Sequence, residues 1–155
     1  SIGSSYVNIN AETAFEKLDE VIAAVKNEGG IVGLHCCGNT DWGLVLKRDI
    51  DILSFDAYNF TKELLLYGNE LKNFFNRGGT IAWGIVPSSD AIDKETPKGL
   101  TERLKAALSA LAEKGIPKDS VSSIITSSCG VGTLDEDRAA RIFTATSRLS
   151  EDFRK

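Results

Sequence analysis

The chain reads Leu34-His35-Cys36-Cys37-Gly38-Asn39-Thr40-Asp41-Trp42 at the end of an apolar run that begins near Ile31. Such a run ahead of a loop is typical of a β-strand, whose successive side chains point to opposite faces of a sheet. In that conformation His35 and Cys37 share one face and Cys36 lies on the other. Because zinc binds imidazole nitrogen and cysteine sulfur, this strand end offers two corners of a tetrahedral zinc site.

Two later strand ends supply candidates for the remaining corners. Asp56 follows the apolar run that ends at Phe55, and Cys129 follows the run that ends near Thr126. A carboxylate and a thiolate are both accepted zinc ligands. The lone cysteine left over, Cys36, is expected in the core, where free cysteine is common.

The composition describes a single folded domain. The chain has 155 residues, of which 42% are hydrophobic and 26% charged, so it can bury a core. Its net charge of -4 gives no electrostatic reason to expect nucleic acid or an anionic membrane as a partner. The sequence has no apolar run long enough for a membrane span and no secretion signal. Three cysteines, two of them adjacent, fit a reduced and therefore cytoplasmic protein better than a disulfide framework.

Periodicity predicts helices that alternate with short strands. The strands are expected at 31–37, 50–55, 80–86 and 121–126, and their nearly continuous apolarity predicts burial on both faces. The helices are expected after an Asn10 N-cap, after Thr40, over 60–76 with Gly68 inside, around 100–111, and from a Thr133 capping box to the end. One helix followed by four βα units predicts a parallel sheet with right-handed crossovers.

The candidate ligands all fall where the predicted strands end. Parallel α/β proteins bind their ligands at the carboxyl ends of the strands, in open sheets and in barrels alike. We therefore expect His35, Cys37, Asp56 and Cys129 to converge on one edge. Gly130-Val131-Gly132 also lies there, but we expect it to serve a tight turn rather than to bind an anion. Asp41 is expected to cap a helix, and Trp42 and Trp83 to pack in the core.

Several of these motifs carry a family resemblance. From about Gly30 onward the chain resembles the C-terminal half of the cobalamin-independent methionine synthase family, and it is similar to the zinc methyltransferases of the uroporphyrinogen decarboxylase superfamily. The resemblance rests on an H-x-C followed by Gly-Asn at 35–39, on Asp51-Ile52-Leu53-Ser54-Phe55-Asp56, and on Ser128-Cys129-Gly130-Val131-Gly132-Thr133.

The resemblance implies a fold and a ligand set. The family fold is a (β/α)8 TIM-type barrel of about 250 residues, so residues 1–155 are expected to form a single partial domain that covers its C-terminal half in four βα units. The implied zinc ligands are His35, Cys37 and Cys129, with Asp56 where the family has Glu. Because Asp is one methylene shorter, Asp56 is expected either as an exchangeable ligand or as a group outside the ligand shell.

The implied activity is methyl transfer to a thiol, most simply homocysteine, from a folate or a corrinoid protein. Only a thiolate is a strong nucleophile, and zinc favours the thiolate of a bound thiol. The family's first four strands are missing, so this chain alone is expected to be inactive and to associate as a homo-oligomer or with the missing half. The alternatives are a methylcorrinoid methyltransferase of the coenzyme M type and a non-enzymatic zinc-binding interaction domain, in which four protein ligands close the site.

Overall fold

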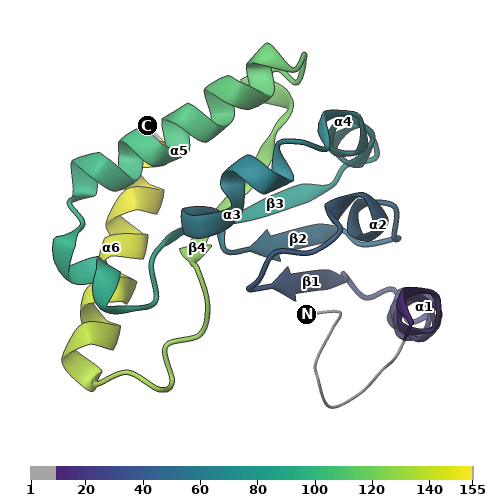
Figure 1. Ribbon diagram of the computed structural model, residues 1–155, viewed down its shortest axis with the longest axis horizontal. Helices are drawn as coiled ribbons and strands as arrows, with labels where there is room; N and C mark the ends of the chain where they lie inside the picture. The colour runs from purple at the N-terminus through teal and green to yellow at the C-terminus, as the bar shows by residue number, and fades with distance from the viewer. Residues whose placement is uncertain (1–9, 155) are drawn as a thin grey trace.

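The protein is an α/β fold with one four-stranded parallel sheet (Figure 1). The computed structural model describes residues 10–154. The strands are β1 (Gly33–Cys36), β2 (Ile52–Phe55), β3 (Thr80–Val86) and β4 (Ser122–Ser127), and they lie in the order in which they occur in the chain. All three pairings are parallel, as the sequence predicts.

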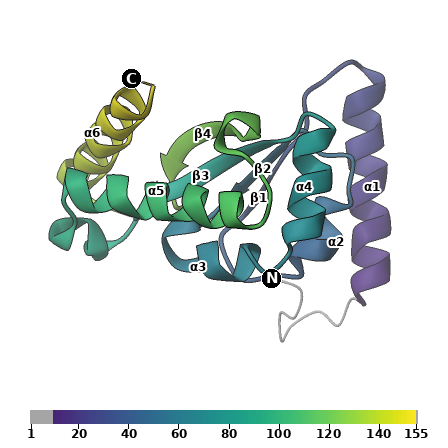
Figure 2. The ribbon, with the colours of Figure 1, turned by 90° about the horizontal axis from the view of Figure 1, so that it is seen from above.

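Six α-helices and two 3-10 helices of the described chain connect and flank these strands (Figures 1 and 2). Their bounds are α1 (Ala11–Asn27), α2 (Trp42–Leu46), α3 (Ala57–Leu64), α4 (Gly68–Asn76), η1 (Asp90–Lys94), α5 (Pro97–Glu113), η2 (Lys118–Ser120) and α6 (Glu136–Phe153).

Several helix starts follow directly from capping side chains. Asn10 accepts a hydrogen bond from the Thr13 N–H at 2.7 Å, which confirms the predicted cap of α1. Asp41 caps α2 in the same way, by accepting from the Leu44 N–H at 3.1 Å. Such bonds satisfy N–H groups that have no partner within the first turn of a helix.

Two helix predictions need correction. The expected single helix over 60–76 is two helices, because the chain turns between Leu64 and Gly68 and α4 begins at that glycine. The expected Thr133 cap is also wrong. Asp135 is the N-cap of α6 and accepts from the Arg138 N–H at 2.8 Å, so the helix starts two residues later than its capping-box pattern predicts.

Helices cover one face of the sheet, and the core lies there. The buried strand residues on this face are Leu53, Phe55, Ile81 and Trp83, each no more than 1% exposed. Trp42 and Trp83 stand on either side of Phe55, at centroid distances of 5.6 Å and 5.7 Å, in edge-on contacts. Both tryptophans are therefore packing residues, as predicted.

The opposite face is more open than the apolarity of the strands suggests. Gly33 and His35 in β1, and Ser122 and Ile124 in β4, are exposed. The prediction that all four strands are buried on both faces is therefore wrong for the two outer strands and holds best for β3. This open face carries the row His35, Ser54, Ala82 and Ile124, which are register partners across the sheet.

Candidate metal centre

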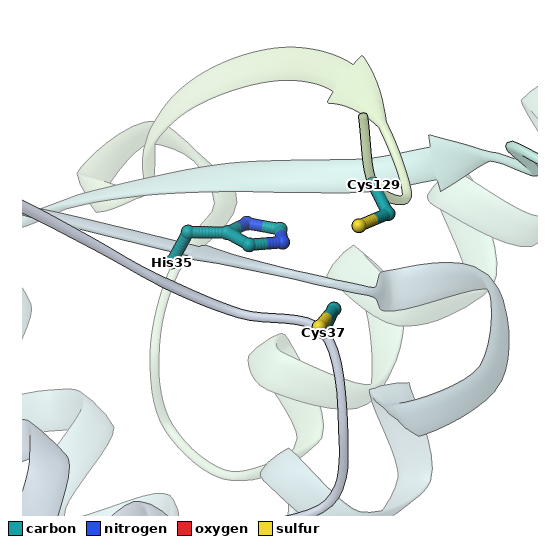
Figure 3. A group of neighbouring side chains, drawn as sticks. All are labelled: His35, Cys37 and Cys129. Carbon is teal, nitrogen blue, oxygen red and sulfur yellow. The ribbon is translucent and has the colours of Figure 1, made fainter. Parts of the chain in front are cut away.

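Three of the predicted ligands come together at the carboxyl edge of the sheet. The imidazole nitrogen of His35 and the sulfurs of Cys37 and Cys129 all lie within 4.8 Å of one another. Figure 3 shows the imidazole ring of His35 extending toward the two cysteine side chains, with all three side chains close together. Cys129 comes from the far end of the sheet, after β4, so the group exists only in the folded chain.

A hydrogen bond between the His35 ring and Ser54 of the neighbouring strand orients the ring. Its Nδ1 lies 2.8 Å from the Oγ of Ser54, which is its register partner in β2. Since Nδ1 is engaged with this hydroxyl, Nε2 is the nitrogen that remains for a metal. Ser54 is a polar residue within the otherwise apolar stretch Ile52-Leu53-Ser54-Phe55, and this contrast is the one sequence signal that distinguishes it.

Strand alternation separates the two adjacent cysteines. Cys37 is exposed and its thiol lies near His35 and Cys129, whereas Cys36 packs against the hydrophobic core. The Cys36 thiol also donates to the Gly38 carbonyl oxygen at 3.4 Å. The predicted separation of their side chains is confirmed, with Cys36 against the core and Cys37 beside His35.

Short polar contacts hold the loop that carries Cys129. The Ser127 hydroxyl donates to the Cys129 carbonyl oxygen at 2.8 Å. The buried Ser128 hydroxyl accepts from the Ser88 N–H at 3.0 Å, which ties this loop to the loop after β3. Gly84 lies beneath, where a Cβ atom would meet the Phe55 carbonyl oxygen at 2.3 Å, so only glycine lets the backbones approach this closely.

Asp56 lies at the same edge but is not a member of the group among the described residues. Its carboxylate is buried and caps α3, accepting from the Asn59 N–H at 3.0 Å and from the Asn59 side-chain amide at 2.7 Å. Of the two expectations for Asp56, this geometry favours a position outside the ligand shell.

The donor set fits a metal that prefers nitrogen and sulfur. In a tetrahedral zinc site with bonds of about 2.0–2.3 Å, neighbouring ligand atoms are about 3.6–3.8 Å apart. The three groups need to approach by only about an ångström to reach that spacing. The three groups could therefore hold a metal ion, and among the described residues no fourth His, Cys, Asp or Glu belongs to the group.

Comparison with known proteins adds no relative. No protein-family model matches the chain, and neither the curated proteins nor the solved structures contain a significant match.

Within residues 10–154 no helix has both the length and the apolar character that a membrane crossing requires.

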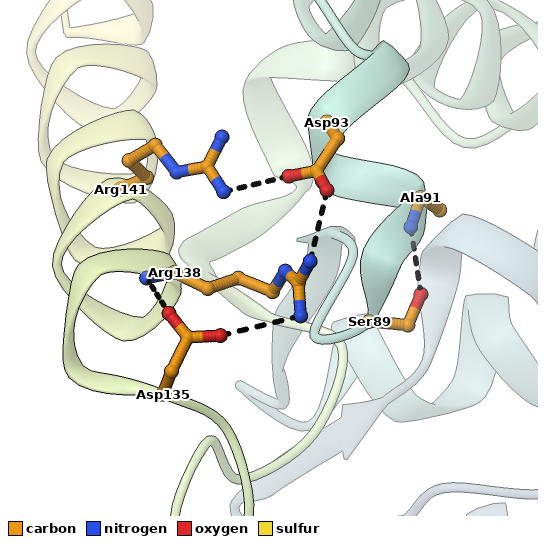
Figure 4. Close-up of polar contacts among 6 residues, drawn as sticks. All are labelled: Ser89, Ala91, Asp93, Asp135, Arg138 and Arg141. Carbon is orange, nitrogen blue, oxygen red and sulfur yellow. Dashed lines mark hydrogen bonds and ion pairs between the residues drawn. The ribbon is translucent and has the colours of Figure 1, made fainter.

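A cluster of charged side chains links η1 to the start of α6 (Figure 4). Asp93 in η1 accepts from Arg138 at 3.0 Å and from Arg141 at 2.7 Å, both on α6. Arg138 also pairs with Asp135 at 3.3 Å. These ion pairs join the segment after β3 to the start of the helix that follows the loop.

Hydrogen bonding to Arg138 lowers the pKa of Asp93 from its usual value, and the same pair raises the pKa of Arg138. A carboxyl whose pKa is lower in the folded than in the unfolded chain stabilises the fold above the unfolded pKa, which is about 3.9 for Asp. That contribution is lost as the pH falls through the lower, folded-state pKa.

We predict that Asp93→Asn lowers the midpoint of denaturant unfolding at neutral pH, because it removes the charge that both arginines contact. The difference from the wild type should shrink as the pH falls below about 4, where the carboxyl of the unfolded chain becomes protonated, and should vanish below the lower pKa of the folded chain. Unfolding curves from neutral to acidic pH measure this, with Asp119→Asn, an exposed carboxylate in η2, as the control for a change in net charge. Equal stability of Asp93→Asn and wild type at neutral pH and low salt would show that the ion pairs contribute nothing.

Proposed function

We propose that this chain carries the zinc site of a methyltransferase that activates a thiol, with homocysteine as the acceptor. The observation that carries the proposal is the group of His35, Cys37 and Cys129, which offers one imidazole and two thiols and has no fourth donor among the described residues. Catalytic zinc sites use three protein ligands plus water or substrate, whereas structural sites use four protein ligands. The resemblance of the H-x-C and S-C-G motifs to zinc methyltransferases supports the same reading.

The chemistry of the proposal follows from the donor set. Zinc, when bound, lowers the pKa of a coordinated thiol so that the thiolate is present at neutral pH. His35 and the two cysteines would hold the metal, and Nδ1 of His35 lies 2.8 Å from the hydroxyl oxygen of Ser54. In the methyl transfer the acceptor thiol loses its proton, its sulfur forms a bond to the methyl carbon, and the bond from that carbon to the donor breaks with its electron pair on the donor.

We also propose that the sheet is the C-terminal half of a (β/α)8 barrel. Strands in the order β1-β2-β3-β4, with helices covering one face, are what consecutive βα units of a barrel provide. In a flat sheet the outer strands would lie about 14 Å apart, three strand spacings of about 4.8 Å. The approach of residues that follow β1 and β4 to within 4.8 Å supports a concave open face.

We predict that Cys37→Ser and Cys129→Ser each lose stoichiometric zinc, because each removes one of three protein ligands. Cys36→Ser should keep zinc, since its side chain lies on the other face, and Asp56→Asn should lose far less affinity than either ligand variant because its carboxylate caps α3. Metal analysis of the purified variants after dialysis measures this, with circular dichroism to confirm folding. Zinc loss in Cys36→Ser equal to that in Cys37→Ser would contradict the assignment.

We predict that a thiol substrate enters the open position. X-ray absorption at the zinc edge should count two sulfur ligands in the loaded protein and three after homocysteine is added to the complete enzyme. Coenzyme M in place of homocysteine tests the alternative acceptor, and serine serves as a control without a thiol. An unchanged sulfur count with both thiols would argue against thiol activation, and four protein ligands before any addition would indicate a structural zinc domain.

We predict that the chain associates with a second copy or with the missing half, because exposed apolar side chains line the free edge of the sheet next to β1. Val21 and Val25 on α1 and Ile31 before β1 are 62%, 40% and 76% exposed. Sedimentation should show a species heavier than the 16.7 kDa monomer, and Ile31→Glu should shift it to the monomer. Leu66→Glu, at a residue 79% exposed on the α3–α4 connection, is the matched control. A stable wild-type monomer at micromolar concentration would contradict the half-barrel proposal.

A further inference from the structure

Ser54 stands out among the residues around the metal centre because it touches a ligand without being one. Its hydroxyl oxygen lies 2.8 Å from Nδ1 of His35, and the two residues are register partners in β1 and β2. Parallel register and strand alternation place both side chains on the open face. The contact is therefore a consequence of strand pairing and does not depend on a loop conformation.

Ser54 is held more rigidly than the ligand it contacts. Its neighbours Leu53 and Phe55 are fully buried, at 0% exposure each, and β2 is paired with a strand on both sides. His35, by contrast, lies exposed in an outer strand. An exposed imidazole can rotate about two side-chain bonds, so its position depends on whatever fixes the ring.

The hydrogen bond also selects the tautomer of the ring. A neutral imidazole carries its proton on one nitrogen only, and a metal must bind the other. If Nδ1 carries the proton and donates it to the Ser54 hydroxyl, Nε2 keeps its lone pair and faces the two thiols. Outer partners of this kind typically change metal affinity by about 10- to 100-fold when they are removed.

We infer that Ser54 is a positioning residue that fixes the ring orientation and the Nδ1–H tautomer of His35 and so sets the metal affinity of the site. This inference rests on the proposed zinc site. It goes beyond that proposal because it assigns a role to a residue that is not a ligand and that does not contact substrate in the proposed reaction.

The affinity test uses variants that differ by one hydroxyl. Ser54→Ala should lower zinc affinity by about 10- to 100-fold in a competition titration against a chromophoric chelator. Ser54→Thr keeps the hydroxyl and should restore most of the affinity, whereas Ser54→Val has the shape of threonine and should not. Ser122→Ala is the matched control, since Ser122 is on the same face and accepts from Thr80 at 2.9 Å at the other end of β4.

A second readout reports on the ring itself. His35 is the one histidine of the sequence, so the imidazole nitrogen spectrum of uniformly ¹⁵N-labelled protein contains a single side chain and needs no assignment. In the zinc-loaded wild type and in Ser54→Thr, the Nδ1–H proton should be visible and slow to exchange with water. In Ser54→Ala and Ser54→Val it should exchange faster, whereas in the control Ser122→Ala it should exchange as slowly as in the wild type.

The outcomes separate this inference from the proposed function. Wild-type zinc affinity and slow Nδ1–H exchange in Ser54→Ala would overturn the role of Ser54 while leaving the zinc site intact. Equal affinities of Ser54→Thr and Ser54→Val would overturn it even if Ser54→Ala failed to fold. A wild-type chain that binds no zinc would overturn the proposed site, and the role of Ser54 with it.

Discussion

Parallel pairing of the four strands is the constraint on which the candidate metal centre depends. Because the strands run in one direction, all of their carboxyl ends lie at one edge, and residues far apart in the chain meet there. The register that pairs His35 with Ser54 also turns both side chains to the open face. A slip by one residue would exchange the faces and carry His35 toward the core, away from Cys129. The strand pairing therefore brings the three candidate metal-binding side chains together without a bound metal.

The aromatic contacts on the covered face anchor the segment that holds Cys37. Trp42 is 0% exposed and begins α2 directly after the loop that contains Cys37, and its ring packs edge-on against Phe55 of β2. Asp41 caps the same helix. The loop is thus fixed at one end by β1 and at the other by a buried side chain and a cap. Burial of Trp42 on the covered face helps to position the exposed thiol of Cys37 at the edge of the sheet, because it offsets part of the conformational entropy that the loop loses on being ordered.

The sequence predicted most of the elements because periodicity and caps are local signals. Apolar runs located the four strands, and Asn10 and Asp41 marked helix starts that the structure confirms. The errors lie where a local pattern has two readings. Thr133 and Asp135 are both good caps, and only the path of the loop after Cys129 decides for Asp135. The burial of each strand face was not predictable, since apolarity does not reveal whether a further layer covers the sheet.

The role of Ser54 shows a second limit of reading a sequence. The role of a serine within an apolar strand can be assigned only when the register is known. The side chain opposite it is defined by strand pairing and not by spacing along the chain. Once β1 and β2 are aligned, the same residue becomes the partner of the only imidazole in the sequence. His35, Cys37 and Cys129 could be predicted because their side-chain chemistry is distinctive, whereas Ser54 is recognised by its position alone.

The hydrogen bonds of Asp56 explain why its carboxylate is not part of the candidate metal-binding group among the described residues. A buried carboxylate needs hydrogen-bond donors, and the first turn of α3 provides them through the Asn59 N–H and the Asn59 amide. A carboxylate that turned from this position toward a metal would have to give up its hydrogen bonds to Asn59. The shorter side chain of Asp, compared with Glu, keeps the carboxylate close to its own helix. Because the carboxylate of Asp56 is bonded to the first turn of α3, the group among the described residues has three protein donors, one fewer than a structural zinc site uses.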